Sequence, residues 1–207
     1  MRTDGSARVA RRSRLPAAER RELIEATATE LFAARGYKGA SIEEIARRSG
    51  VTPPVVYDHF DSKLDLYRGL LERRFADLRE VWRQGLGAEG PVAERAAGAI
   101  DAWFAYIEDH PAAARMLFRE GGGDAAAEAV HAEVAGRSAA AVMPLFAAQP
   151  GARNLAGSLD EQGIEMAWVV LRGILQGLAL WWVDHPEVPR ERVVATAMNA
   201  LSVVAQE

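Results

Sequence analysis

The chain has 207 residues, of which 49% are hydrophobic, so it can bury the core of one medium domain or of a small domain joined to a larger one. It contains no cysteine, which excludes disulfide scaffolds, thiolate metal sites and thiol catalysis, and which fits a reducing, cytoplasmic compartment. Residues 1–63 carry 12 basic and 9 acidic side chains, whereas the remainder carries 13 and 20. A basic front and an acidic rear indicate that only the front faces a polyanion.

Two segments stand out by their composition: the basic N-terminal arm and an apolar segment near the C-terminus. Residues 1–15 include five arginines and no apolar run of the kind found in signal peptides, so we expect a disordered basic arm. The most apolar stretch, residues 166–183, is interrupted by Arg172 and Gln176. We therefore expect a buried helix there and no membrane partner.

Hydrophobic periodicity is helical along nearly the whole chain and predicts an all-α fold. The first helix begins at Pro16, which suits a first helical position, and Gly36 ends it in the left-handed region. Its apolar stripe consists of Ile24, Ala28, Leu31 and Phe32.

A second, short helix follows a capping box, in which Ser41 is the N-cap and Glu44 lies three residues later. It ends near Gly50, and a third helix opens with Thr52 as its cap. We expect the Thr52 hydroxyl to accept a hydrogen bond from the N–H of Val55. Two short helices joined by a tight turn form a helix-turn-helix, whose second helix can enter a DNA major groove.

Six more helices are predicted behind these three, at about 63–84, 92–109, 111–120, 124–148, 159–184 and 189–205. The first of them opens with a second capping box, in which Ser62 is the N-cap and Asp65 lies three residues later. This pattern divides the chain into three parts. We expect the basic arm at 1–15, a three-helix DNA-binding domain at 16–62, and a six-helix domain at 63–207.

Residues 23–71 resemble the DNA-binding region of the TetR family of bacterial transcriptional regulators. The segment "IEEIARRSGVT" is followed by a Tyr-x-His-Phe signature at residues 57–60 and by Ser62 and Lys63 before Leu64. The resemblance implies a homodimer with one DNA-reading head per subunit, a rear domain that binds a small-molecule effector, and repression as the common mode.

The resemblance also implies contacts with double-stranded DNA. Phosphate contacts fall on Ser41, Thr52, Tyr57, His59 and Lys63, and the base-facing positions are Pro53, Pro54 and Asp58. Asp58 either accepts a hydrogen bond from a cytosine amino group or holds Arg48 or another basic side chain in position. Each of these contacts has an alternative interpretation. Tyr57 would also fit a half-buried core position, and His59, Lys63 and Arg48 would also fit as solvated surface side chains.

The rear domain offers bulky apolar residues for an effector cavity that suits a hydrophobic or aromatic ligand. The candidates are Trp103, Phe104, Ile107, Met116, Phe118, Met143, Phe146, Met166, Trp168 and Arg172. Residues of these types at helical spacing are more often plain core. Arg172, the one charge in a very apolar helix, binds a ligand carboxylate or makes a structural ion pair.

The last two helices carry apolar stripes that predict a four-helix dimer interface, as the TetR family uses its last two helices. The candidates are Leu171, Leu175, Leu178, Trp182, Ala197, Leu201 and Val204. The alternative is the core of a monomer. Gly173 and Gly177 lower helix propensity, which the close approach of another helix would explain.

No catalytic or metal-binding constellation emerges, so we expect neither an enzyme nor a cofactor. The four histidines are scattered, without a second ligand at metal spacing. The sequence therefore predicts a DNA-binding regulator, a repressor released from a palindromic operator by a small hydrophobic ligand. The alternative is a small-molecule binding protein with weak or vestigial DNA binding.

Overall fold

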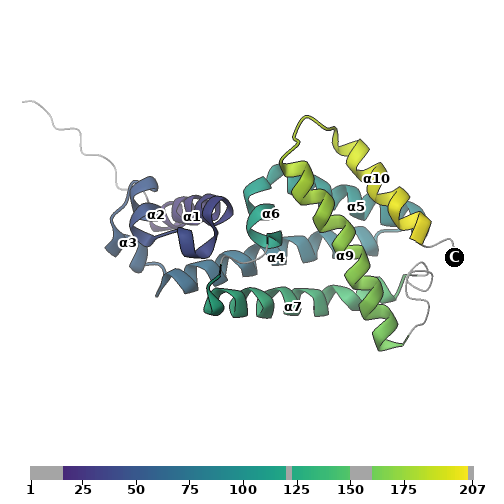
Figure 1. Cartoon of the computed structure of the whole chain (residues 1–207), viewed down its shortest axis with the longest axis horizontal. Helices are drawn as coiled ribbons and strands as arrows, with labels where there is room; N and C mark the ends of the chain where they lie inside the picture. The colour runs from purple at the N-terminus through teal and green to yellow at the C-terminus, as the bar shows by residue number, and fades with distance from the viewer. Residues whose placement is uncertain (1–15, 120–122, 150–159, 205–207) are drawn as a thin grey trace, which may run out of the picture.

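The computed structural model describes residues 16–119, 123–149 and 160–204, and every regular element in these ranges is an α-helix (Figure 1). Three helices form the front of the molecule: α1 (Ala17–Gly39), α2 (Ile42–Arg48) and α3 (Pro53–Tyr57). Six form the rear: α4 (Lys63–Gly87), α5 (Val92–Asp109), α6 (Pro111–Phe118), α7 (Ala125–Ala147), α9 (Glu161–Val183) and α10 (Arg190–Val204). The predicted all-α fold with three and six helices is confirmed. The basic arm, 1–15, lies outside the described residues.

The long helix α4 connects the two groups (Figure 1). Its N-terminal end lies beside α1, α2 and α3, which we call the head, and the rest of α4 runs through the other helices, which with α4 we call the body. In the body, α7 and α5 pack along α4, and α9 and α10 pack on each other and on α5. The head also contacts the body through α1, which packs against α6.

The head has its own apolar core. The predicted stripe of α1 is buried throughout, and Ile42, Ile45 and Val56 meet it from α2 and α3. The chain of α1 breaks at Gly36, where φ is +67°, and this confirms the predicted left-handed glycine. The core thereby holds α2 and α3 against α1 and against each other.

The predicted caps form at two of three places. The Ser41 hydroxyl accepts from the N–H of Glu44 at 3.2 Å, and Ser62 does the same for Asp65 at 3.0 Å. The prediction for Thr52 is wrong, because its side chain makes no capping bond and the N–H of Val55 instead donates to the Thr52 carbonyl oxygen at 3.0 Å. That N–H is therefore already satisfied by the backbone.

One close approach fixes where α4 meets α5. A Cβ added at Gly85 would lie 2.5 Å from the Ala99 Cβ and 2.6 Å from its Cα, so no side chain fits there. Gly69, earlier on the same helix, has nothing within 4 Å of such a Cβ. The close packing of α4 on α5 therefore requires glycine at position 85, whereas the space at position 69 admits a side chain.

We expect opposite effects from alanine at these two positions. Gly69→Ala should raise the free energy of unfolding by about 1 kcal/mol, because alanine favours helix over glycine. Gly85→Ala should lower it by about 1–3 kcal/mol, since the new methyl overpacks against Ala99. Urea denaturation of both variants measures the difference, and equal stabilisation by both would contradict the close approach.

Candidate DNA interface and effector cavity

The candidate reading helix α3 has five residues and is held by its buried side. Val56 is fully buried and Phe60, just beyond the helix, is 4% exposed. On the opposite side Pro54, Tyr57 and Asp58 are exposed, with Tyr57 at 52%. Tyr57 is therefore not core, and this exposed side of α3 is free to meet a ligand as large as DNA.

The basic side chains beside α3 are organised by one carboxylate. Glu44 accepts a hydrogen bond from Arg35 at 2.6 Å and forms ion pairs with Arg48 at 2.8 Å and with Arg47 at 3.5 Å. The expectation that Asp58 holds Arg48 is therefore wrong for this structure. Among the described residues, the Asp58 carboxylate has no hydrogen-bond or ion-pair partner.

Lys63 lies at the start of α4 and is engaged within the protein. Its ammonium donates to the carbonyl oxygens of Tyr37 and Ala40, both at 3.0 Å, and lies 4.1 Å from the centre of the Tyr37 ring. These contacts tie the end of α1 to α4. A lysine has three N–H donors, so one is left for the phosphate contact that the family resemblance implies.

The remaining DNA candidates lie on the surface around α3. Ser41 and Thr52 are exposed at the starts of α2 and α3. Pro53 is half-buried at the first position of α3, and His59 is half-buried just after it. All the candidate positions thus gather on one end of the head, and the contacts themselves stay predictions.

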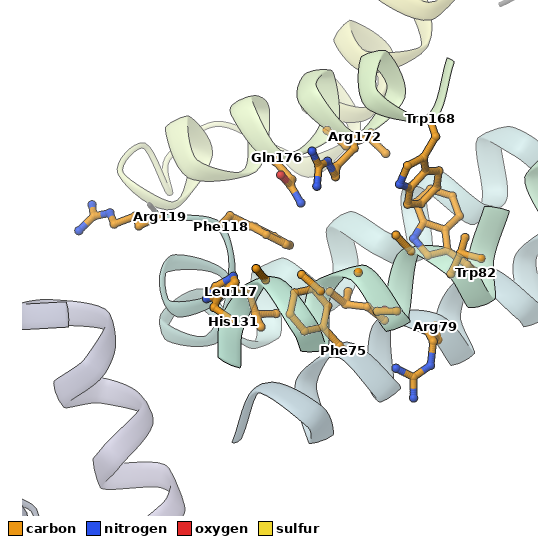
Figure 2. A pocket seen from close by; sticks show the side chains of 18 of the residues that line it. Phe75, Arg79, Trp82, Leu117, Phe118, Arg119, His131, Trp168, Arg172 and Gln176 are labelled. Atoms are coloured by element: carbon orange, nitrogen blue, oxygen red, sulfur yellow. The ribbon is translucent and has the colours of Figure 1, made fainter. Parts of the chain in front are cut away.

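The body contains a cavity of about 570 Å³, partly open to solvent, between α4, α6, α7 and α9 (Figure 2). Its walls are largely aromatic, with the rings of Tyr37, Tyr67, Phe75, Trp82, Trp103, Phe118 and Trp168. Small residues of α7 form one wall: Ala127, Ala132, Ala135, Gly136 and Ala139. The volume lies within the range of about 300–1,000 Å³ of small-molecule sites.

Four of the ten residues predicted for an effector site line this cavity: Trp103, Phe118, Trp168 and Arg172. Five others pack in the body away from its walls: Phe104, Ile107, Met116, Met143 and Phe146. Met166 is 62% exposed on the surface of α9. The α4 and α7 walls were not predicted, although the run of small residues in α7 was the visible signal for space.

Polar groups stand at separate places in the cavity. The Tyr67 hydroxyl lies 3.1 Å from Nδ1 of His131, and the ring centres of Phe32 and Tyr37, both on α1, lie 5.1 and 5.2 Å from that of Tyr67. The Trp168 Nε1 is buried, with no hydrogen-bond partner among the described residues. In Figure 2, Arg172 and Gln176 project side by side from α9 toward the cavity. Arg172 makes no ion pair with any described residue.

The predicted dimer residues divide between core and surface. Leu171 and Leu175 are buried and line the cavity, whereas Trp182 and Ala197 are buried in the body. Leu178 and Leu201 are half-buried, and the side chain of Val204 lies outside the described residues. The large apolar residues that α9 exposes are instead Met166, Val169, Val170 and Trp181. The apolar stripe of α9 that was predicted to form the dimer interface lies mostly on the side of the helix that faces its own subunit.

The apolar surface of α9 explains a membrane-like signal. Within the part of the chain that the structure describes, α9 is the one helix long and apolar enough to cross a membrane, by length and composition only. In that stretch 28% of residues are buried. Core helices of soluble proteins pass the same test, so the signal is weak evidence for a span.

Known proteins share sequence with the part of this chain that contains the helix-turn-helix. A family model for bacterial regulatory proteins of the tetR family matches residues 24–70, which cover the helix-turn-helix. The transcriptional activator FasR of Mycolicibacterium smegmatis is 41% identical over 108 residues, which are 52% of this chain and 49% of that protein. The DNA-binding region of this chain is therefore similar to that of TetR-family regulators. The match to this relative thus spans about half of its length.

Solved TetR-like structures share the fold well beyond the head. The regulator FadR of Bacillus subtilis, in complex with stearoyl-CoA, has a TM-score of 0.68 at 17% identity, covering 89% of this chain and 97% of that one. A TetR-like regulator from Rhodococcus sp. RHA1 has a TM-score of 0.67 at 22% identity, covering 93% and 96%. At these identities the likeness shows the fold, which includes the body.

The half-buried His131 gives the stability of the protein a pH dependence. Burial lowers the pKa of His131, and a hydrogen bond to the Leu117 backbone only partly opposes this. The unfolded chain takes up a proton on this group below about pH 6.5, where the folded chain does not. His131 therefore destabilises the fold as pH falls below that value and contributes nothing well above it.

We expect His131→Gln to flatten the decline of stability in acid. The unfolding free energy of the unaltered protein should fall more steeply between pH 7.5 and 5 than that of the variant, because glutamine takes up no proton. Urea denaturation at a series of pH values makes the comparison. Parallel pH profiles would contradict the assignment.

Proposed function

We propose that the chain is a homodimeric, sequence-specific DNA-binding transcriptional regulator that responds to a small apolar ligand. The observation that carries the proposal is the anchored helix α3, which presents an exposed tyrosine within a TetR-family helix-turn-helix. In such a motif the second helix enters the major groove and the first crosses the backbone. The cytoplasm, where bacterial DNA lies, is the expected compartment.

Contacts to phosphates and to bases divide between two sets of residues. Hydroxyl, imidazole and cationic groups at Ser41, Arg48, Thr52, Tyr57, His59 and Lys63 face phosphates, which position the head. Pro53, Pro54 and Asp58 face the bases, which supply the sequence preference. Arg48 needs to exchange Glu44 for a phosphate, whereas Tyr57 is already free.

A homodimer is supported by the exposed side of α9. Its four large apolar side chains, Met166, Val169, Val170 and Trp181, form the kind of patch that marks a protein interface. Gly173 and Gly177 are also exposed on α9, and a Cβ added at either meets nothing within the subunit. A second copy packing α9 and α10 against the same helices would cover this surface with a four-helix interface.

The cavity supports an effector that is long, apolar and anionic at one end. Aromatic walls suit an apolar chain, and Arg172 with Gln176 offers a charge and hydrogen bonds at the α9 wall. FadR of Bacillus subtilis, which shares the fold, was solved in complex with stearoyl-CoA. A long-chain acyl thioester of coenzyme A is therefore the first ligand class to test.

Repression is the expected mode, since a dimer on a palindrome blocks transcription and a ligand that reorients the heads would release it. FasR, however, bears the name of an activator. A reporter placed downstream of the operator, with and without the effector, distinguishes the two signs.

A second candidate function is effector binding with vestigial DNA recognition. The observation that favours it is the acidity of the reading surface, where Asp58 and Asp61 are exposed and α3 itself carries no cation. A carboxylate near phosphates lowers DNA affinity unless it meets a hydrogen-bond donor.

Selection of genomic DNA fragments by the purified protein, with sequencing of the retained DNA, separates these functions. We expect one palindrome whose half-site centres lie about one helical turn, or a multiple of it, apart. Affinity should fall steeply with salt, because each head neutralises several phosphates. No enrichment at low salt from folded protein would support the vestigial alternative.

Tyr57→Phe tests the phosphate contact directly. Losing a hydroxyl that bonds a charged phosphate should weaken operator binding roughly tenfold, with unchanged helical content. Tyr106→Phe is the matched control, because it removes a hydroxyl that bonds Asp77 inside the body. Wild-type affinity in Tyr57→Phe would contradict the assignment.

For the effector, we expect stearoyl-CoA to bind saturably and to change the fluorescence of the cavity tryptophans. Arg172→Met should weaken this binding about tenfold, because a hydrogen bond to a charged group is lost. A neutral long-chain alcohol should be unaffected, and so should Arg192→Met, an exposed arginine on α10. Equal weakening for both ligands would mean that Arg172 shapes the cavity and does not bind an anion.

A further inference from the structure

One buried carboxylate joins the head to the body. Among the described residues, Glu25 of α1 is the charged side chain that the fold buries, at 8% exposure. It accepts from Nε of Arg21, one turn earlier on α1, at 2.9 Å, and from the Arg73 guanidinium of α4. A carboxylate removed from water needs such partners, because an unpaired buried charge costs several kcal/mol.

Arg21 extends this link to the end of the reading helix. Its guanidinium carbon lies 4.5 Å from the centre of the Phe60 ring, a cation–π contact. It also donates to the His59 carbonyl oxygen at 3.4 Å. Residues 59 and 60 follow α3 directly, so Glu25 has one arginine on the body and one on the segment that ends α3.

The body side of the link is close to the cavity. Arg73 lies two residues before Phe75, which lines the cavity on α4. A ligand that displaces this wall therefore acts on the helix that carries Arg73. Shifts of about 1–2 Å between packed helices are typical of allosteric change, and a hydrogen-bonded ion pair either follows such a shift or breaks.

We propose that Glu25 is a positioning residue for DNA reading: held by Arg73, it sets through Arg21 the orientation of α3 relative to α4. The inference rests on the proposed function, since it concerns how that function is regulated. Glu25 touches neither DNA nor effector in this role. Its contribution is that the reading helix keeps one angle to the body, and that motion of α4 reaches the reading helix.

Glu25→Gln tests the proposal because the change of charge and the loss of positioning predict opposite changes in operator affinity. Removing a negative charge from the head should, by charge alone, strengthen binding to every DNA. Loss of positioning instead weakens operator binding, by roughly tenfold for a typical coupling between sites. Glu30→Gln is the matched control, because it makes the same charge change at an exposed position of α1.

The expected result has three parts, measured for folded dimers at one salt concentration. Operator affinity falls in Glu25→Gln, affinity for random DNA is unchanged or higher, and stearoyl-CoA affinity is unchanged. The double variant Glu25→Gln with Arg73→Met also removes the arginine that Glu25→Gln leaves without its carboxylate partner, so it keeps the test valid if the single variant is unstable. We expect its operator affinity to fall by no more than that of Glu25→Gln, because both changes cut the same link.

Other results overturn the proposal. Operator affinity that matches Glu30→Gln shows that Glu25 does not position α3. An equal fall for operator and random DNA, with a shallower salt dependence, shows that Arg21 serves as a phosphate contact. If the unaltered protein selects no operator at all, the proposed function itself fails, which is a distinct outcome.

Discussion

The burial of Val56 and Phe60 is the constraint on which DNA reading in this molecule depends. A helix of five residues has too few internal hydrogen bonds to be stable alone, so tertiary contacts must hold it. Two apolar side chains four residues apart provide that hold from the inner face. The outer face of α3 is then free to carry residues chosen for recognition, including two prolines and an aspartate that no core would favour.

The sequence predicted features that depend on neighbouring residues, and it did not predict contacts between residues that are distant along the chain. Helical periodicity predicted the nine described helices, the α1 stripe and the left-handed Gly36, because these depend on local spacing. It did not predict that Lys63 bonds the Tyr37 and Ala40 carbonyls or that Glu44 gathers three arginines. Hydrogen bonds to backbone carbonyls, and ion pairs between residues distant in sequence, cannot be recognised from local sequence patterns.

The helix α9 shows the limit of pattern analysis most directly. It is apolar on nearly every side, so its stripe was assigned to a second subunit although Leu171, Leu175 and Trp182 pack within their own. Which side faces a partner depends on where α4, α7 and α10 lie, and that is a property of the whole fold. The effector residues missed on α4 and α7 have the same origin, because a cavity is formed by helices that meet only in three dimensions.

The contact between Gly85 and Ala99 constrains how the body can respond to a ligand. Because no space remains there, α4 cannot move closer to α5 at this point, so a rotation of α4 would turn about this contact. The distance along α4 from Gly85 to Lys63 is about 33 Å at 1.5 Å per residue. A small rotation about that contact would therefore displace most the end of α4 that carries the head, so a tight glycine packing far from DNA would magnify a slight change of wall position at the reading surface.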